Sequence, residues 1–160
     1  MDDADDPILA GVARPELEIV EGGATIEVSI GLDVQANNTT IRRVSVHGFG
    51  NDDTNTGSLY TNADIRVGTS ISDGVSGTSL SGVLIEQNVI GVGPSSLADP
   101  GANNRSLNGI GIYGPDGGII QDNVIADTDS VDCGGSTGEP GPGETYYGIM
   151  LDENPGGGTV

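Results

Sequence analysis

Acidic side chains gather in two polar stretches of the sequence, and such groups are typical of a cation or ligand site. Asp127, Asp129 and Asp132 place three carboxylates within six residues, and Asp52 and Asp53 form a second pair. Alternating oxygen donors suit a hard cation, so the sequence predicts calcium as the cofactor of these stretches, although neither matches an EF-hand loop. Without a cation, the same carboxylates would be a solvated, self-repelling loop.

Arginines provide a second candidate for binding. The chain has five of them and no lysine. Arg42 and Arg43 are adjacent in an expected strand, so we expect their side chains to point to opposite faces. One of them stacked with Arg66 would make a small basic spot on an acidic body. The alternative is that they are solvated surface arginines in weak ion pairs.

Composition limits the classes of partner. The net charge of −19 opposes binding to nucleic acid and to anionic membranes. One cysteine and one histidine allow neither an internal disulfide nor a zinc cluster. No stretch approaches the roughly 18 apolar residues that a membrane-spanning helix needs. The 28 glycines and eight prolines favour turns and leave no room for a long helix.

Two short patterns recur along the chain and position these residues. One begins and ends on an apolar residue, at 41–46, 85–90 and 120–125; the other reads Gly-apolar-x-apolar, at 31–34, 109–112 and 148–151. Their β-branched content predicts short strands with no helix between them. The expected strands are Pro7–Leu9, Leu17–Val20, Ala24–Ile30, Leu32–Val34, Thr40–Val46, Asp64–Val67, Gly82–Ile90, Ile110–Tyr113, Ile119–Ile125 and Ile149–Leu151.

Stacking such repeats predicts an all-β fold, a right-handed parallel β-helix (solenoid) of about three to four coils. We expect one domain over residues 7–160, truncated at its C-terminus and continued by further coils of the parent chain, after an acidic tail of residues 1–6. Three polar insertions, 47–63, 91–108 and 126–147, should project from one side. Asn88 and Asn123 occupy equivalent corner positions and should stack as an amide ladder, which Val44 interrupts in the first coil.

The segments 6–11, 14–19, 31–34, 40–44 and 85–91 resemble right-handed parallel β-helix repeat proteins, which are related in fold to pectate lyases. The resemblance covers most of the chain, from about residue 7 to 160. It implies a secreted or cell-surface location and association with polysaccharide. No catalytic motif of that group matches, so the resemblance assigns no catalytic residue.

The chain contains residues that could carry out acid–base chemistry, but their order along the sequence does not match a known catalytic pattern of this fold. A hydrolase of this fold needs paired carboxylates, and Asp52, Asp53 and Asp64 lie near the single histidine, His47. The spacing of these residues differs from the pattern of galacturonases. A lyase of this fold could not use lysine as its base, because the chain contains no lysine. We expect His47 at a corner or in solvent, and a non-catalytic structural or binding segment. The alternative is a fragment of a polysaccharide lyase or glycoside hydrolase.

Overall fold

The structure is a computed structural model that describes residues 7–9, 12–22, 28–50, 62–68, 80–101, 105–113, 118–126, 128 and 148–152. These residues form short strands and no helix. The strands are β1 (Pro7–Leu9), β2 (Val12–Ala13), β3 (Leu17–Val20), β4 (Ile30–Val34), β5 (Thr40–Arg42), β6 (Val44–His47), β7 (Ala63–Val67), β8 (Val83–Glu86), β9 (Val89–Ile90), β10 (Ile110–Tyr113), β11 (Gly118–Gln121), β12 (Val124–Ile125) and β13 (Ile149–Asp152).

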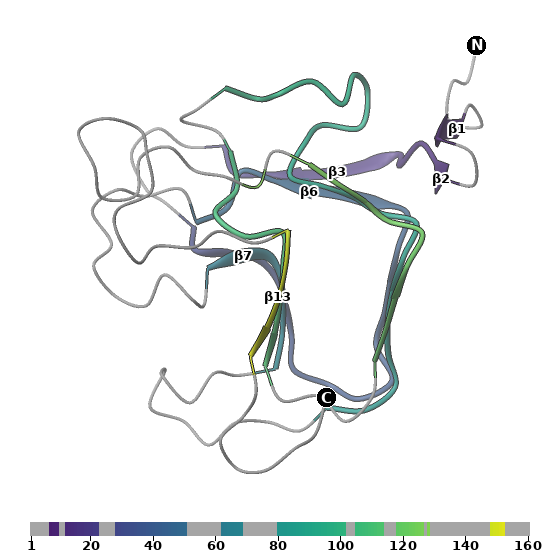
Figure 1. Cartoon of the computed structure of the whole chain (residues 1–160), viewed down its shortest axis with the longest axis vertical. Coiled ribbons are helices and arrows are strands. Elements are labelled where there is room, and N and C mark those ends of the chain that lie inside the picture. The colour runs from purple at the N-terminus through teal and green to yellow at the C-terminus, as the bar shows by residue number, and fades with distance from the viewer. Residues whose placement is uncertain are drawn as a thin grey trace.

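The strands form three parallel sheets that the chain visits in turn (Figure 1). The sheet orders are β13-β10-β7-β4, β11-β8-β5 and β12-β9-β6-β3, and a separate antiparallel pair joins β1 to β2. Each coil therefore contributes one strand to every sheet, which makes a three-sided parallel β-solenoid. The predicted fold class, a parallel solenoid of three to four coils, is confirmed.

Three predicted strands are each divided by a corner. Arg43, Gln87 and Asp122 adopt left-handed backbone conformations, with φ of 56°, 57° and 54°. Each turns the chain from the sheet of β5, β8 and β11 into the sheet of β6, β9 and β12. The sequence favours one continuous strand here because a non-glycine residue at positive φ costs about 1–2 kcal/mol.

Two other differences concern the N-terminal region. Strand β2 was not predicted, and it pairs with β1 instead of joining a coil. Of the expected strand Ala24–Ile30, only Ile30 lies in a strand, β4, while residues 24–27 lie outside the described residues.

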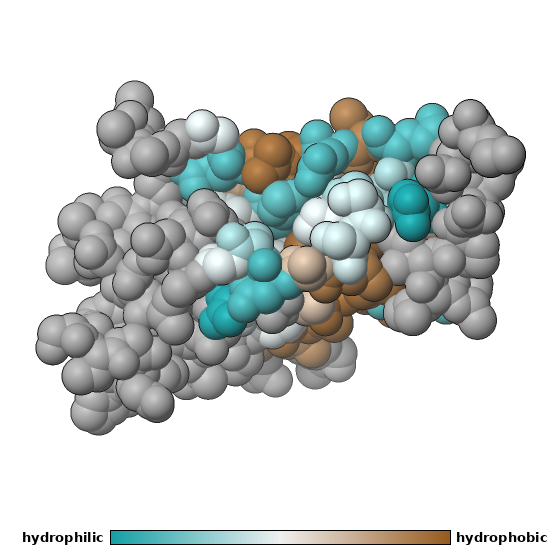
Figure 2. Space-filling view, turned by 90° about the horizontal axis from the view of Figure 1, so that it is seen from above, coloured by the Kyte–Doolittle hydropathy of each residue, from teal (hydrophilic) through white to brown (hydrophobic). Residues whose placement is uncertain are grey.

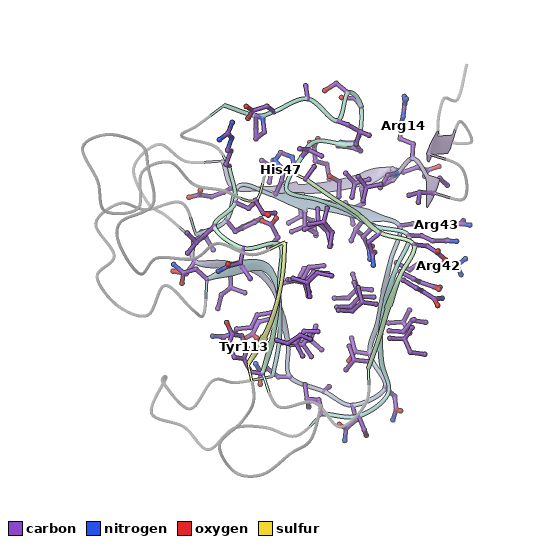
Figure 3. The ribbon with its side chains drawn as sticks, in the orientation of Figure 1. Arg14, Arg42, Arg43, His47 and Tyr113 are labelled. Carbon is purple, nitrogen blue, oxygen red and sulfur yellow. The ribbon has the colours of Figure 1, made fainter. Side chains whose placement is uncertain are left out.

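Aliphatic side chains fill the interior in rows that run from coil to coil (Figure 3). Parallel strands about 4.8 Å apart bring equivalent residues into contact, and β-branched side chains pack well in such rows. The register gives the rows Leu32–Ile65–Ile110–Ile149, Ile41–Ile85–Ile120 and Ile19–Val46–Ile90–Ile125.

Asn88 and Asn123 lie beside the corners and are hydrogen-bonded to each other. The Nδ2 of Asn88 donates to Oδ1 of Asn123 at 3.0 Å, and the backbone N–H of Asn88 donates to the same oxygen at 3.0 Å. Oδ1 of Asn88 accepts from the backbone N–H of Val44 at 3.1 Å, and Nδ2 of Asn88 donates to the carbonyl of Ile41 at 3.1 Å. Asn88 thus connects three successive coils: it bonds to the backbone of Ile41 and Val44 in the first coil and to the side chain of Asn123 in the third. The Val44 N–H donates the last hydrogen bond of the ladder.

Replacing Asn88 by valine, the residue that the first coil has at this position, should lower the free energy of unfolding by at least about 2 kcal/mol. The partly buried N–H of Val44 and carbonyl of Ile41 would lose their partner, and an unsatisfied buried group costs about 1–3 kcal/mol. Urea unfolding followed by far-UV circular dichroism measures the loss. Asn37→Ala is the control, because its side chain accepts an exposed hydrogen bond from Ser81. Equal losses in the two variants would contradict the structural importance of the ladder.

Candidate functional site

Three long connections join the same two sheets. They are residues 48–62 between β6 and β7, 91–109 between β9 and β10, and 126–148 between β12 and β13. Because β6, β9 and β12 are neighbours in one sheet and β7, β10 and β13 in another, all three leave the solenoid at one corner, on the left in Figure 1. We call residues 48–50, 62–64 and 106–109 at this junction the insertion corner. The prediction that the insertions share a side is confirmed for their points of departure.

Buried polar side chains hold the insertion corner together. The backbone N–H of Gly48 donates to Oγ of Ser106 at 2.8 Å, and Nδ2 of Asn108 donates to the carbonyl of Asn62 at 2.8 Å. Asn62, Ser106 and Asn108 are all buried. Satisfied buried hydrogen bonds of this kind fix a local backbone geometry. The first and second insertions therefore start from a common rigid base.

Asp64 is fully buried in this corner. The register of β7 places it level with Gly31 and Gly109. Its Oδ1 accepts a hydrogen bond from the backbone N–H of Phe49 at 3.3 Å, whereas its Oδ2 has no hydrogen-bond partner within the described part of the chain. Burial raises the pKa of the Asp64 carboxyl well above its usual value, and the Ser106 hydroxyl and nearby N–H groups offset this only in part.

Asp64→Asn should gain stability relative to the native chain as the pH rises. The raised pKa means that the folded protein holds the Asp64 proton more tightly than the unfolded chain does. The stability from this proton is therefore complete below the unfolded pKa, near 3.9, and is lost as pH rises through the folded pKa. The difference in unfolding free energy between the two proteins should grow by up to about 1.4 kcal/mol per pH unit. Urea titrations between about pH 4 and 8 measure it, and a difference that is constant with pH would contradict a buried neutral Asp64.

A charged pair lies on the outer face of the sheet β13-β10-β7-β4. Arg66 donates from Nε to Oδ1 of Asp33 at 3.1 Å and from Nη2 to Oδ2 at 2.9 Å. Gln35 donates to Oδ1 of Asp33 at 2.6 Å. Partial burial opposes ionisation of Asp33, but the hydrogen bonds from Arg66 and Gln35 and the charge of Arg66 outweigh it, so the pKa of this carboxyl lies below its usual range. Arg66 is therefore already matched by a carboxylate of the neighbouring coil.

The predicted basic spot is wrong. Arg42 belongs to β5 and Arg66 to β7, and these strands lie in different sheets. Arg42 contacts Glu86 of the next coil, Nε to Oε1 at 3.3 Å, and donates to Gln87 at 3.0 Å. Arg42 and Arg66 thus each contact an acidic or amide side chain one coil away. Spacing along the sequence alone does not reveal these pairs.

The predicted opposite orientation of Arg42 and Arg43 is also wrong. Both side chains point outward from the same corner (Figure 3), and both donate to Oε1 of Gln87. The physical reason is the left-handed conformation of Arg43, with φ of 56°, which interrupts the strand alternation between the two residues.

Of the two positions expected for His47, a corner or solvent, the structure shows the corner, where the side chain is buried. It ends β6, and its Nε2 lies 2.8 Å from Oε1 of Glu18 on β3. The connection 91–101 folds over the outer face of this sheet (Figure 1), and a Cβ on Gly93 would come within 3.2 Å of the same Glu18 oxygen. Ser45 lies on the same outer face and donates from Oγ to the carbonyl of Val92 at 3.1 Å. The histidine thus helps to join the edge strand β3 to β6 beneath this connection.

From the sequence, Asp64 is only one of several carboxylates near His47, and Glu18 has no place in a site. A signal for Asp64 exists: Asp64-Ile65-Arg66-Val67 fits the pattern Gly-apolar-x-apolar with aspartate in the place of glycine. The Glu18–His47 contact has no comparable signal, because it depends on the register of β3 with β6.

The carboxylates predicted to bind calcium or another ligand, Asp52, Asp53, Asp127, Asp129 and Asp132, lie outside the described residues. Within the described ranges, no three His, Cys, Asp or Glu side chains are grouped closely enough to hold a metal ion. Those ranges also contain no helix long and apolar enough to cross a membrane. Comparisons of the chain with protein-family models, curated proteins and solved structures find no match.

Proposed function

We propose that this chain is a structural and binding segment of a secreted or cell-surface protein, in which the solenoid is a rigid scaffold and the insertions bind polysaccharide. One observation carries the proposal. Three long connections leave a single corner, and buried hydrogen bonds fix the base of the first two. By contrast, the arginines of the sheet faces are engaged within the solenoid, Arg42 with Glu86 and Arg66 with Asp33.

The chemistry of the insertions supports a polar ligand. They are rich in Gly, Asn, Asp, Ser and Thr, and the net charge of −19 disfavours nucleic acid and anionic membranes. The resemblance of the repeats to β-helix proteins related to pectate lyases makes polysaccharide the favoured class. Loops positioned by a rigid scaffold are where binding residues commonly lie.

Calcium completes this proposal as a bridging ion. Asp52 and Asp53 belong to the first insertion, and Asp127, Asp129 and Asp132 belong to the third. A divalent cation held by these carboxylates would allow an acidic protein to bind an acidic polysaccharide. The test compares thermal melts in millimolar calcium and in chelator, because a ligand that binds only the folded state must raise its stability. An unchanged melting midpoint would contradict calcium binding.

Binding itself is tested with immobilised acidic and neutral polysaccharides, each with calcium and with chelator. We expect retention of the native chain on at least one of them. Replacing residues 51–61 by a short Gly-Ser linker should abolish retention with little change in the melting temperature. The matched control replaces residues 69–79, which connect β7 to β8 at another corner. Retention that survives the first replacement, or no retention on any polysaccharide, would contradict the proposal.

A specific observation keeps a carbohydrate-active enzyme as the second candidate. Asp33 and Asp64 share the outer face of one sheet, and their surroundings move their pKa values in opposite directions. A protonated and an ionised carboxyl are what glycoside hydrolysis requires. Full burial of Asp64 keeps it from a substrate unless the insertion corner opens, which is why binding is the first proposal. Incubation of the chain with polysaccharides tests this candidate. New reducing ends, or new unsaturated ends that absorb in the ultraviolet, would favour the enzyme over the binding segment.

A further inference from the structure

The turn between β4 and β5, residues 35–39, contains a modification motif that the proposed function does not use. The sequence Asn37-Asn38-Thr39-Thr40 holds two overlapping Asn-X-Ser/Thr motifs, which are acceptors of N-linked glycans, and residues 104–106 form a third. A motif of three residues also arises by chance, so the surroundings of each asparagine decide whether it can accept a glycan.

The side-chain nitrogen of Asn37 is accessible for reaction. Asn37 is exposed, and its Oδ1 accepts a hydrogen bond from the backbone N–H of Ser81 at 2.9 Å. Its Nδ2 has no hydrogen-bond partner within the described part of the chain. The turn therefore fixes this side chain through its oxygen. A sugar attached to the nitrogen would leave that oxygen in place as an acceptor.

The hydroxyl group that the motif requires is accessible as well. Thr39 is the third residue of the Asn37 motif, and its Oγ1 donates to the carbonyl of Ala36 at 2.8 Å in an exposed hydrogen bond. Water competes for such a bond, so exchanging it for a polar group of a transferase costs little. The turn thus offers both groups of the Asn37 motif at the surface.

The other two motifs are engaged with the solenoid. Asn38 has φ of 56°, its N–H donates to the carbonyl of Ser81 at 2.9 Å, and a Cβ added to Gly82 would come within 2.5 Å of its Oδ1. Its side-chain amide is therefore packed against the next coil. In the third motif, Ser106 is completely buried and accepts the N–H of Gly48. A transferase cannot reach that hydroxyl in the folded chain.

The turn 35–39 lies at a different corner from the insertions, on the lower side in Figure 1. Figure 2 looks onto the opposite side, where the connection 91–101 crosses the molecule and polar and apolar surface are mixed. N-linked glycans are bulky and solvated. A glycan on this turn would project into solvent and leave the insertion corner free.

We propose that Asn37 carries an N-linked glycan. In this modification, Nδ2 of Asn37 attacks the anomeric carbon of an oligosaccharide that is linked to a polyprenyl diphosphate. The nitrogen–carbon bond forms and the bond from that carbon to the diphosphate oxygen breaks. The lipid diphosphate leaves with the electron pair, and a base of the transferase takes one amide proton. The inference rests on the secreted or cell-surface location proposed above, because such transferases modify exported chains.

The experiment incubates the folded full chain with an oligosaccharyltransferase that modifies Asn-X-Ser/Thr motifs and with its lipid-linked donor. Intact-mass spectrometry gives the occupancy, and glycopeptide mapping gives the position. We expect one glycan per chain, on Asn37. A synthetic peptide of residues 33–43 shows that the enzyme is active under the same conditions. A modified peptide beside an unmodified folded chain would overturn the proposal.

Variants of two threonines assign the position without changing either asparagine. Thr39→Ala removes the hydroxyl of the Asn37 motif and should abolish the glycan, whereas Thr39→Ser should restore it. Thr40→Val removes only the hydroxyl of the Asn38 motif and keeps a β-branched residue in β5, so the glycan should remain. A glycan that survives Thr39→Ala, or one found on Asn38 or Asn104, would contradict the assignment. Circular dichroism confirms that each variant is folded.

Failure of this proposal can be distinguished from failure of the proposed function. The transfer assay contains no polysaccharide ligand, and retention on polysaccharide is measured on the unmodified chain. A folded chain that is retained but accepts no glycan would contradict only the glycan on Asn37. A chain that accepts the glycan but is not retained would contradict only the binding of polysaccharide.

Discussion

Gly91→Ala should destabilise the solenoid by about 3–5 kcal/mol, enough to unfold most of a marginally stable chain. Gly91 follows β9 with φ of 86°, and a Cβ there would overlap the backbone carbonyl oxygen of Ala126 in the next coil. Backbone atoms cannot yield as a flexible side chain does, so two adjacent coils would have to separate. Far-UV circular dichroism during urea unfolding measures the loss.

Gly101→Ala separates the two parts of this cost. Gly101 also has positive φ, 91°, but its Cβ would meet nothing within 4 Å. Its replacement should cost only the conformational part, about 1–2 kcal/mol. Similar losses in the two variants would show that the coils are not packed as closely at Gly91 as described.

Ile65→Ala should cost about 2–5 kcal/mol. Ile65 is completely buried, and its row places it between Leu32 below and Ile110 above. Truncation would leave a cavity between coils whose backbones are held by parallel hydrogen bonds, so the site can collapse only in part. Chemical denaturation of the two proteins at the same pH gives the difference.

Ile119→Ala is the matched control for this substitution. Ile119 is 56% exposed on edge strand β11, so the same truncation should change stability by no more than about 0.5 kcal/mol. A loss at Ile65 no greater than the loss at Ile119 would contradict the interior row. Ile65→Val, which removes a single methyl group, should fall between them at about 0.5–1.5 kcal/mol.

The rows of side chains from coil to coil could be predicted because short repeated segments of the sequence carry their members. Ile41, Ile85 and Ile120 stand at the same place in three similar segments, and stacking equivalent residues is the simplest way to bury them. The division of each of these segments into two strands could not be predicted. It depends on left-handed conformations at Arg43 and Gln87, and neither residue type favours them.

The candidate site was less predictable because its contacts cross from one coil to another. Arg66 was recognised as a charged residue, but its partner Asp33 lies in the preceding coil and is fixed by the pairing of β4 with β7. The burial of His47 likewise follows from the connection 91–101 folding over its sheet. Predicting these contacts requires both the path of the insertions and the register of the strands. The repeat pattern gives only part of that register.

The buried hydrogen bonds at the insertion corner connect stability with the proposed function. Asp64, Ser106 and Asn108 hold the base from which the first two insertions begin. A change at these residues would therefore alter the presentation of the insertions as well as stability. The Asp64→Asn variant is useful for this reason, since it keeps the shape and the Oδ1 acceptor while it removes the titrating proton.

Nuclear magnetic resonance of the chain with labelled isoleucine methyl groups tests the in-register solenoid most directly. Methyl groups of neighbouring coils lie within the range of nuclear Overhauser effects when strands are about 4.8 Å apart. The stacked coils predict cross-peaks between Ile41 and Ile85, between Ile85 and Ile120, and between Ile65 and Ile110. A well-dispersed spectrum of a folded chain without these cross-peaks would contradict the stacked coils, and with them the common corner on which the proposed function depends.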